Sequence, residues 1–115
     1  MKQTPWKLKR LRQCDKCPWR KAIDPYEIPN GYDKEKHRAL AGTIADPGDL
    51  SHLYAPELRI MACHELHDTH CVGWLIHQLG PGNNIPLRIN MLSCTNAAKL
   101  QTVGDQHETF GDTLP

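Results

Sequence analysis

Four cysteines in two pairs constrain this chain more than any other feature. The first pair is Cys14-x2-Cys17, a spacing that lets two thiolates face one ion across a tight turn, and the second is Cys63-x7-Cys71. Structural zinc sites commonly take such pairs from distant parts of a chain and hold one ion in a tetrahedron. The pattern therefore predicts one Zn²⁺ per chain, with these four cysteines as its ligands.

Other assignments of the same residues stay open. His64, directly after Cys63, is the alternative to one thiolate and would give a Cys3His set. An iron–sulfur cluster uses the same four thiolates, and spacing alone does not separate it from zinc. A redox role for the CxxC pair is disfavoured, because no strand is predicted before it. Cys94 lies far from the other four in sequence and is expected to be a small apolar residue in a helix.

The size and composition of the chain agree with a need for a metal. A chain of 115 residues allows one domain, and its single Phe, nine Pro and eight Gly indicate a thin core with many loops. The N-terminus lacks the apolar stretch of a signal peptide, and no apolar run approaches the roughly eighteen residues of a membrane span. We therefore expect a cytoplasmic protein (host-cell cytoplasm if viral), where thiols stay reduced.

Hydrophobic periodicity and turn residues give an expected fold. Asp33 is a candidate N-cap, and Asp46-Pro47-Gly48 is a candidate helix stop. The sequence predicts helices over residues 34–45, 71–79 and 85–100, the last of which also alternates like a strand, and a strand over residues 58–63. The expected class is α+β: a small zinc-stabilised single domain with a CxxC knuckle, a short sheet and two to three helices. Its expected organisation is a basic N-terminal arm, 1–13, followed by a zinc-binding domain, 14–115.

Charge is distributed unevenly along the chain. Residues 1–21 hold eight basic residues and one acidic residue, net +7, whereas the remainder holds six basic and twelve acidic residues, net −6. Such an arm indicates either an anionic partner or docking of the arm onto its own acidic body. Trp19 and Arg20 could extend it as a stacking and phosphate-contacting surface, although a Trp beside a metal knuckle also serves to cover the site. The candidate partner-binding residues are Lys7, Lys9, Arg10, Arg12, Trp19 and Arg20.

The sequence argues against an enzyme. His64-Glu65-Leu66-His67 resembles the HExxH motif of zinc proteases, but the position four residues after His64 is Asp68. A shell of four cysteines also leaves no position for an activated water. The rival hypothesis is a zinc-dependent hydrolase or nuclease with an open coordination position near His64, Glu65 and His67.

Several motifs resemble a family of small uncharacterised proteins of tailed phages, prophages and some bacteria. They are Cys14-Asp-Lys-Cys17-Pro18-Trp19-Arg20, Met61-Ala-Cys63-His64, Cys71-Val-Gly73-Trp74-Leu and Leu79-Gly-Pro-Gly-Asn-Asn84, with His107-Glu-Thr-Phe110 near the end. The resemblance implies a zinc-binding phage protein with the same four cysteines as ligands, and it supplies no substrate. By analogy with small phage proteins, a host or defence protein is the favoured partner. A nucleic-acid-binding zinc module is the alternative.

Overall fold

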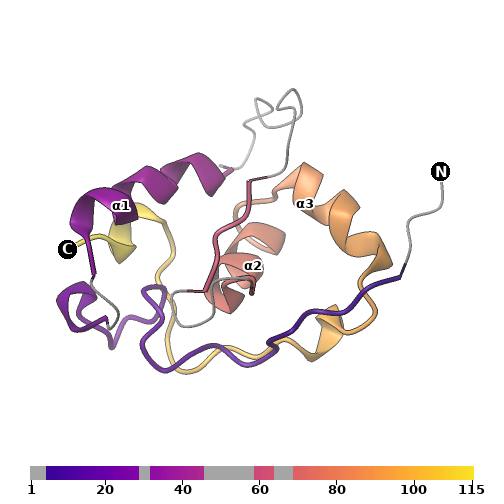
Figure 1. Cartoon of the computed structure of the whole chain (residues 1–115), viewed down its shortest axis with the longest axis horizontal. Coiled ribbons are helices and arrows are strands. Elements are labelled where there is room, and N and C mark those ends of the chain that lie inside the picture. Colours follow the sequence, from indigo (N-terminus) through magenta and orange to yellow (C-terminus); the bar gives the residue numbers. More distant parts are fainter. Residues whose placement is uncertain (1–4, 29–31, 46–58, 64–68) are drawn as a thin grey trace.

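Within the part of the chain that the structure describes, the fold contains three short helices, together with turns and extended segments (Figure 1). The computed structural model describes residues 5–28, 32–45, 59–63 and 69–115. The helices are α1 (Lys34–Ala39), α2 (Val72–Leu79) and α3 (Ile85–Asn90). Single 3-10 turns complete the described secondary structure: η1 (Pro25–Glu27), η2 (Leu40–Thr43), η4 (Met91–Ser93), η5 (Ala97–Lys99) and η6 (Gly111–Thr113).

The expected α+β class with a short sheet is wrong, because the described residues contain no β-strand and no sheet. What occurs instead is a set of isolated bridges between extended segments. The segment expected as a strand, 58–63, is described from Arg59 onward and makes one such bridge, Ala62 with His70. The other bridges pair Trp6 with Cys94, Arg12 with Gln101, and Arg20 with Gln106.

Side-chain amides explain why these bridges do not grow into strands. Residues 6–21 run beside residues 93–107. We call the part before the CxxC pair, residues 5–13, the N-terminal segment. Between the bridges, the Asn96 side chain makes the hydrogen bonds that a neighbouring strand's backbone would make. It accepts from the Leu8 N–H at 2.9 Å and donates to the Leu8 carbonyl at 3.1 Å. The Gln13 side chain likewise accepts from the Val103 N–H at 2.8 Å. The backbone groups are satisfied without a continuous ladder.

The helix expected over 34–45 forms only in part. Asp33 is its N-cap as predicted, accepting from the backbone N–H groups of Glu35 (2.9 Å) and Lys36 (3.4 Å). The α-helical part ends at Ala39, and the chain tightens into η2 before Ile44 returns to extended backbone. The Thr43 hydroxyl donates to the Leu40 carbonyl at 2.7 Å, which satisfies one acceptor at this helix end.

α1 is fixed to the C-terminal segment, residues 101–115, through a buried histidine. The Tyr32 hydroxyl lies 2.7 Å from His37 Nδ1, and His37 Nε2 lies 3.1 Å from Thr113 Oγ1. The Thr113 hydroxyl donates to the Phe110 carbonyl at 2.6 Å, so it accepts from an Nε2–H. The network therefore fits the neutral imidazole, and burial lowers the pKa of His37 below its usual range.

α2 is the central helix, and it occupies the predicted place with Cys71 as its N-cap residue. Trp74 is fully buried, and its indole N–H donates to the Thr43 carbonyl at 2.9 Å. Gln78 is also fully buried: its Oε1 accepts from the Ala45 N–H at 2.7 Å and from Asn84 Nδ2 at 3.0 Å. α2 thereby anchors the end of the α1–η2 segment and the turn before α3.

The third predicted helix is shorter than expected. Residues 85–100 divide into α3, η4 and η5, and Cys94 has extended backbone between the two 3-10 turns instead of a helical conformation. Asn84 is the N-cap, accepting from the Leu87 N–H at 3.1 Å, and Pro86 fits the first turn. The chain leaves the helix because residues 93–96 bond to Trp6 and Leu8.

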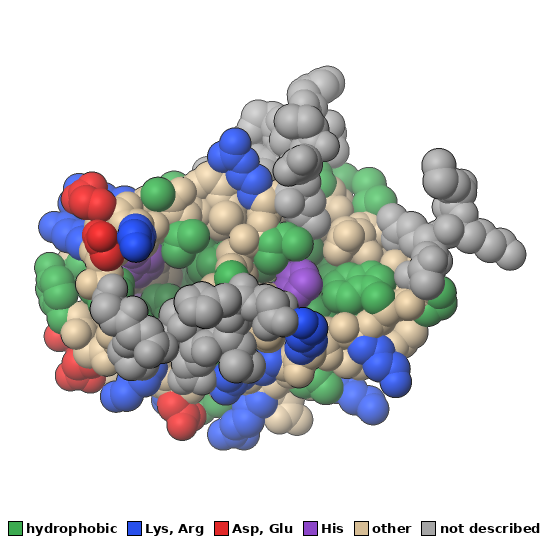
Figure 2. Space-filling view, viewed as in Figure 1, with side chains coloured by type: hydrophobic (Ala, Val, Ile, Leu, Met, Phe, Trp, Pro, Cys, Tyr) green, Lys and Arg blue, Asp and Glu red, His purple; other side chains and the backbone are tan. Residues whose placement is uncertain are grey.

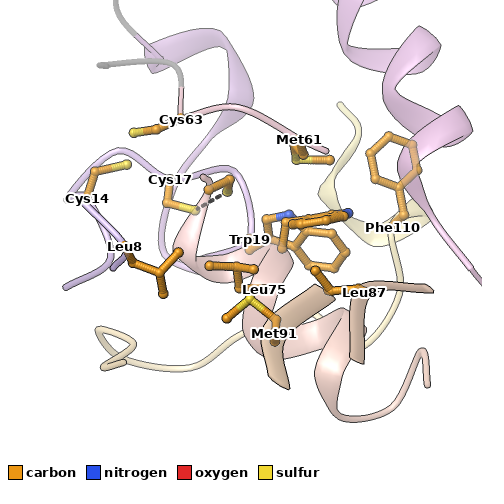
Figure 3. Close-up of a cluster of buried hydrophobic side chains, with 12 residues drawn as sticks. Leu8, Cys14, Cys17, Trp19, Met61, Cys63, Leu75, Leu87, Met91 and Phe110 are labelled. Atoms are coloured by element: carbon orange, nitrogen blue, oxygen red, sulfur yellow. Dashed lines mark hydrogen bonds between the residues drawn. The ribbon is translucent and has the colours of Figure 1, made fainter. Parts of the chain in front are cut away.

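The core lies between α2, α3 and the N-terminal segment. It combines large side chains with the thiols of the two cysteine pairs (Figure 3). Among the described residues, no helix has the length and apolar character needed to cross a membrane. The least exposed core side chains, at 2% or below, are Cys17, Trp19, Ala45, Met61, Val72, Trp74, Leu75 and Leu87.

Candidate metal centre

The first cysteine pair lies in a tight turn directly after the N-terminal segment. The Cys17 N–H donates to the Cys14 carbonyl at 3.3 Å, and the Arg20 N–H donates to the Cys17 carbonyl at 3.0 Å. Both side chains are buried, with 4% of Cys14 and 1% of Cys17 exposed. The CxxC turn therefore directs both thiols inward.

The second pair lies on two adjacent extended segments. The Cys63 N–H donates to the Thr69 carbonyl at 2.7 Å, and the Cys71 N–H donates to the Met61 carbonyl at 2.9 Å. α2 begins immediately after Cys71. Backbone pairing thus brings together two cysteines that a seven-residue loop separates in sequence, and both are buried.

The two pairs meet in the core. The Sγ atoms of Cys17 and Cys71, 54 positions apart in sequence, lie 3.8 Å from each other. Cys14 also interacts with both Cys17 and Cys63, which raise its pKa, so the thiols form a connected series, Cys63–Cys14–Cys17–Cys71. Cys14, Cys17 and Cys63 are seen together at one side of the buried cluster in Figure 3. The predicted ligands are therefore close together in space.

The distance between the sulfurs of Cys17 and Cys71 can be compared with a disulfide bond and with a zinc site. A disulfide would need about 2.05 Å, and the five cysteines, all within the described residues, form none. A tetrahedral zinc site with Zn–S bonds of about 2.3 Å has S–S edges of about 3.8 Å. The Cys17–Cys71 distance of 3.8 Å matches one such edge.

The four sulfurs do not form a complete tetrahedral site in this arrangement. Within the described part of the chain, no group of three or more His, Cys, Asp or Glu side chains is arranged to hold a metal ion. The thiols contact one another in series, whereas the ligands of a metal ion all surround one point. Metal binding at these thiols would therefore require local side-chain adjustment.

Amide N–H groups surround the two central sulfurs. Cys17 accepts from the Trp19 backbone and the Gln13 side chain, and Cys71 accepts from the Trp74 backbone. Hydrogen bonds from Cys14 first, then from Cys71, lower the pKa of Cys17, and these amides add to the effect. The hydrogen bond with Cys17, together with burial, raises the pKa of Cys71. Such donors stabilise thiolate, the form that binds metals.

Gln13 is the residue that inspection of the sequence missed. It is 1% exposed, and its side-chain amide forms a reciprocal pair with Gln106, with N–O distances of 2.6 and 2.8 Å. It holds the CxxC turn against the C-terminal segment. Its position directly before Cys14 carries no signal of this role, because the contact spans 93 positions of sequence.

The other candidate ligands differ in position. Cys94 is half-buried, and its thiol donates to Asn96 Oδ1 at 3.3 Å, so it is engaged away from the four-sulfur series. His70 stacks on Trp6, with a distance of 5.6 Å between ring centroids. The predictions for His64, Glu65 and His67 lie outside the described residues.

Trp19 does not provide the predicted surface for base stacking. Its side chain is 1% exposed and stacks on His77, with ring centroids 4.6 Å apart. Gly73 permits this packing, because a Cβ at that position would lie 2.6 Å from Trp19 Cβ. Trp19 therefore packs behind the CxxC turn, which fits the interpretation of a covering residue.

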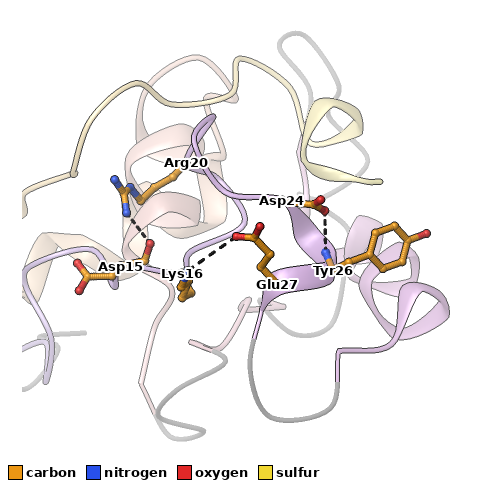
Figure 4. Close-up of polar contacts among 6 residues, drawn as sticks. All are labelled: Asp15, Lys16, Arg20, Asp24, Tyr26 and Glu27. Carbon is orange, nitrogen blue, oxygen red and sulfur yellow. Dashed lines mark hydrogen bonds and ion pairs between the residues drawn. The ribbon is translucent and has the colours of Figure 1, made fainter.

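Arg20 is also part of the fold. It is half-buried, its Nε donates to the Val103 carbonyl at 2.9 Å, and its Nη1 donates to the Asp15 carbonyl at 2.5 Å (Figure 4). Figure 4 also shows the nearby ion pair between Lys16 and Glu27. Among the remaining partner-binding candidates, Lys7, Lys9 and Arg12 are exposed and Arg10 is half-buried.

A small apolar hollow lies beside the CxxC turn, between α2 and the C-terminal segment. Its volume is about 90 Å³, below the roughly 300–1,000 Å³ typical of ligand pockets. The lining residues are Trp19, Gly73, Ile76, His77, Pro81, Gln106 and His107. The hollow is suited to a single small apolar group.

Comparisons with known proteins give no relative: no family model, no curated protein and no solved structure matches the chain.

Proposed function

We propose that this chain is a small binding module whose fold is stabilised by one structural zinc ion. The observation that carries the proposal is the convergence of four buried thiols, from two distant parts of the chain, with a Cys17–Cys71 sulfur distance equal to a tetrahedral edge. Zn²⁺ favours such thiolate donors, and amide N–H groups already point at two of the sulfurs.

Burial of the thiols favours a structural role over a catalytic one. A catalytic zinc keeps one coordination position open to water or substrate. Here the four sulfurs are each 4% exposed or less, and the hollow beside them is apolar and small. The rival hydrolase or nuclease would depend on His64, Glu65 and His67, and no contact of the described residues supports it. Binding, without turnover, is therefore the proposed activity.

The biological setting rests on the sequence resemblance. We propose a phage-type protein that acts in the cytoplasm of a host cell. A host or defence protein was the favoured partner at the sequence level, with nucleic acid as the alternative. The choice between them depends on the exposed surface of the module, considered below.

Metal content tests the proposal directly. Protein purified without chelators should contain about one zinc per chain by elemental analysis, with no visible absorbance from an iron–sulfur cluster. Cys71→Ser should lose the metal and several kcal/mol of unfolding free energy, because metal binding is coupled to folding. Cys94→Ser is the matched control and should keep both.

Three results would contradict the zinc assignment. Iron with sulfide in the purified protein would indicate a cluster. Loss of metal in Cys94→Ser but not in Cys71→Ser would show that the ligand set is different. Fresh protein with no metal, yet a cooperative unfolding transition unaffected by chelator, would show that the thiols are only core residues.

A further inference from the structure

The N-terminal basic residues lie on a defined edge of the molecule. Residues 5–13 are hydrogen bonded along residues 93–103: Trp6 to Ser93 and Thr95, Leu8 to Asn96, and Leu11 and Gln13 to Gln101. This pairing places Lys99 alongside the N-terminal segment, between the contacts of Asn96 and Gln101. We call Lys7, Lys9, Arg10, Arg12 and Lys99 the basic edge.

The basic edge is built from segments without acidic residues. Residues 5–13 and 93–103 together contain five basic residues and no Asp or Glu. All acidic residues of the described part fall within residues 14–45 and 104–115. In Figure 2 the red side chains lie in the left half of the view, mixed with blue ones, whereas the lower right edge carries blue ones without red. The fold thus places these basic residues apart from the acidic ones, a separation that the net charge of +1 does not reveal.

Several features of the edge are fixed by the fold. Arg10 Nε donates to the Arg12 carbonyl at 2.8 Å, and Trp6 Nε1 donates to Ser93 Oγ at 3.1 Å. Lys7, Arg12 and Lys99 are exposed on this frame. Extended backbone rises about 3.3 Å per residue, so Lys7 and Arg12 span about 17 Å. One strand of a duplex presents a phosphate about every 3.4 Å, or roughly five over that length.

From these observations we propose that the basic edge binds the phosphate backbone of nucleic acid without reading its sequence. Nucleic-acid interfaces are much more positively charged than protein interfaces, whose buried centres are depleted in Lys. Trp19 and Trp74 are buried and Trp6 is stacked on His70, which removes these rings as stacking platforms. Contact is therefore to phosphates and not to bases. This inference rests on the proposed function, since it names the partner class of the same binding module.

Salt dependence of binding tests the inference. Labelled 20-base-pair DNA and the matching single strand are titrated by fluorescence anisotropy at 50, 100 and 200 mM salt. Three to five phosphate contacts predict a slope of log K against log salt of roughly −2.7 to −4.5 for duplex. Two unrelated base sequences should bind equally. The variant Lys7→Ala/Arg12→Ala/Lys99→Ala should reduce the slope by about 2.7 units and weaken binding at least tenfold at 100 mM salt.

A matched variant controls for net charge. Lys21→Ala/Lys34→Ala/Lys36→Ala also removes three positive charges, but from residues outside the basic edge, and should change the slope by less than about one unit. Equal losses in the two variants would overturn the proposal, because binding would then follow net charge alone. Negligible binding to both nucleic acids would overturn it as well. So would tighter binding to poly-glutamate or to phosphatidylserine vesicles, which would identify an acidic protein or a membrane surface.

The zinc proposal and this proposal fail separately. Zinc content and the circular dichroism spectrum of both triple variants should equal those of the parent. Edge-dependent binding by a protein that contains no zinc would reject the metal assignment and keep the nucleic-acid assignment. Full zinc content without nucleic-acid binding would do the reverse.

Discussion

Replacement of Gly73 by Ala tests the packing that supports the CxxC turn. Gly73 lies in the first turn of α2, and an added Cβ would lie 2.6 Å from Trp19 Cβ, 2.8 Å from Gln13 Nε2 and 2.9 Å from Trp19 Cγ. Carbon atoms in contact normally lie about 3.5–4.0 Å apart. The closest of these atoms is a Cβ, whose position is set by the backbone, so rotation of the Trp19 side chain cannot relieve the contact. The backbone of α2 or of the turn must therefore shift.

The expected loss of stability follows from two opposing effects. Overpacking of this kind costs about 1–3 kcal/mol, while Ala in a helix is favoured over Gly by about 0.8–1 kcal/mol. Because three atoms would lie closer than 3.0 Å to the added Cβ, the cost should fall in the upper half of its range. The net loss should then be about 1–2 kcal/mol, which lowers the Tm by about 4–8 °C for a domain of this size. Because the Trp19 amide also donates to Cys17, the variant should bind metal more weakly than the parent.

Thermal and urea unfolding at a fixed zinc concentration measure this effect. Gly111→Ala is the matched control, since the nearest atom to its added Cβ is Thr109 Oγ1 at 3.8 Å, an ordinary contact. It should change stability by no more than about 0.5 kcal/mol. If Gly73→Ala proved as stable as the parent while retaining its zinc affinity, the close approach of α2 to the turn would be refuted.

Two further predictions concern buried polar groups. Because burial lowers the pKa of His37 in the folded state, the unfolded state binds more protons, and stability should fall as the pH drops below about 6.5, by up to about 1.4 kcal/mol per pH unit. The groups facing His37 are the Tyr32 phenol, the Thr113 hydroxyl and the Phe110 ring; His37→Gln should show a shallower pH slope in urea unfolding, and an unchanged slope would reject the assignment. Gln78→Leu should lower the unfolding free energy by about 2–4 kcal/mol, because it leaves the Ala45 N–H and Asn84 Nδ2 without this partner in the core. A urea midpoint equal to that of the parent would show that these groups find other partners.

Local signals in the sequence predicted much of the local structure. Asp33 before a polar-apolar periodic segment indicated an N-cap, and the apolar face of residues 72–79 indicated a helix starting at Cys71. The cysteine spacing predicted which four thiols lie close together. The first two features depend on residues within a few positions of each other. The third depends on the paired spacing of the cysteines.

The features that failed depend on distant partners. Residues 85–100 have helical periodicity, but the Asn96 side chain bonds to the Leu8 backbone, 88 positions away, and the chain leaves the helical path. Residues 59–63 are extended as expected, yet among the described residues Met61 and Cys63 pair only with a short neighbouring segment, 69–71, and no sheet is present there. Tertiary contacts override local preference in both cases.

Gln13 connects the candidate metal centre to the basic edge. Its backbone pairs with Gln101, its side chain pairs with Gln106, and the same amide donates to the Cys17 sulfur. The residue therefore belongs to the segment that carries Arg12 and to the environment of the thiols. A metal that fixes the CxxC turn would also fix the end of the N-terminal segment against residues 101–106. In this arrangement a bound zinc ion would act on binding only through the frame: it would order the backbone that presents the lysines and arginines, and it would contact no partner itself.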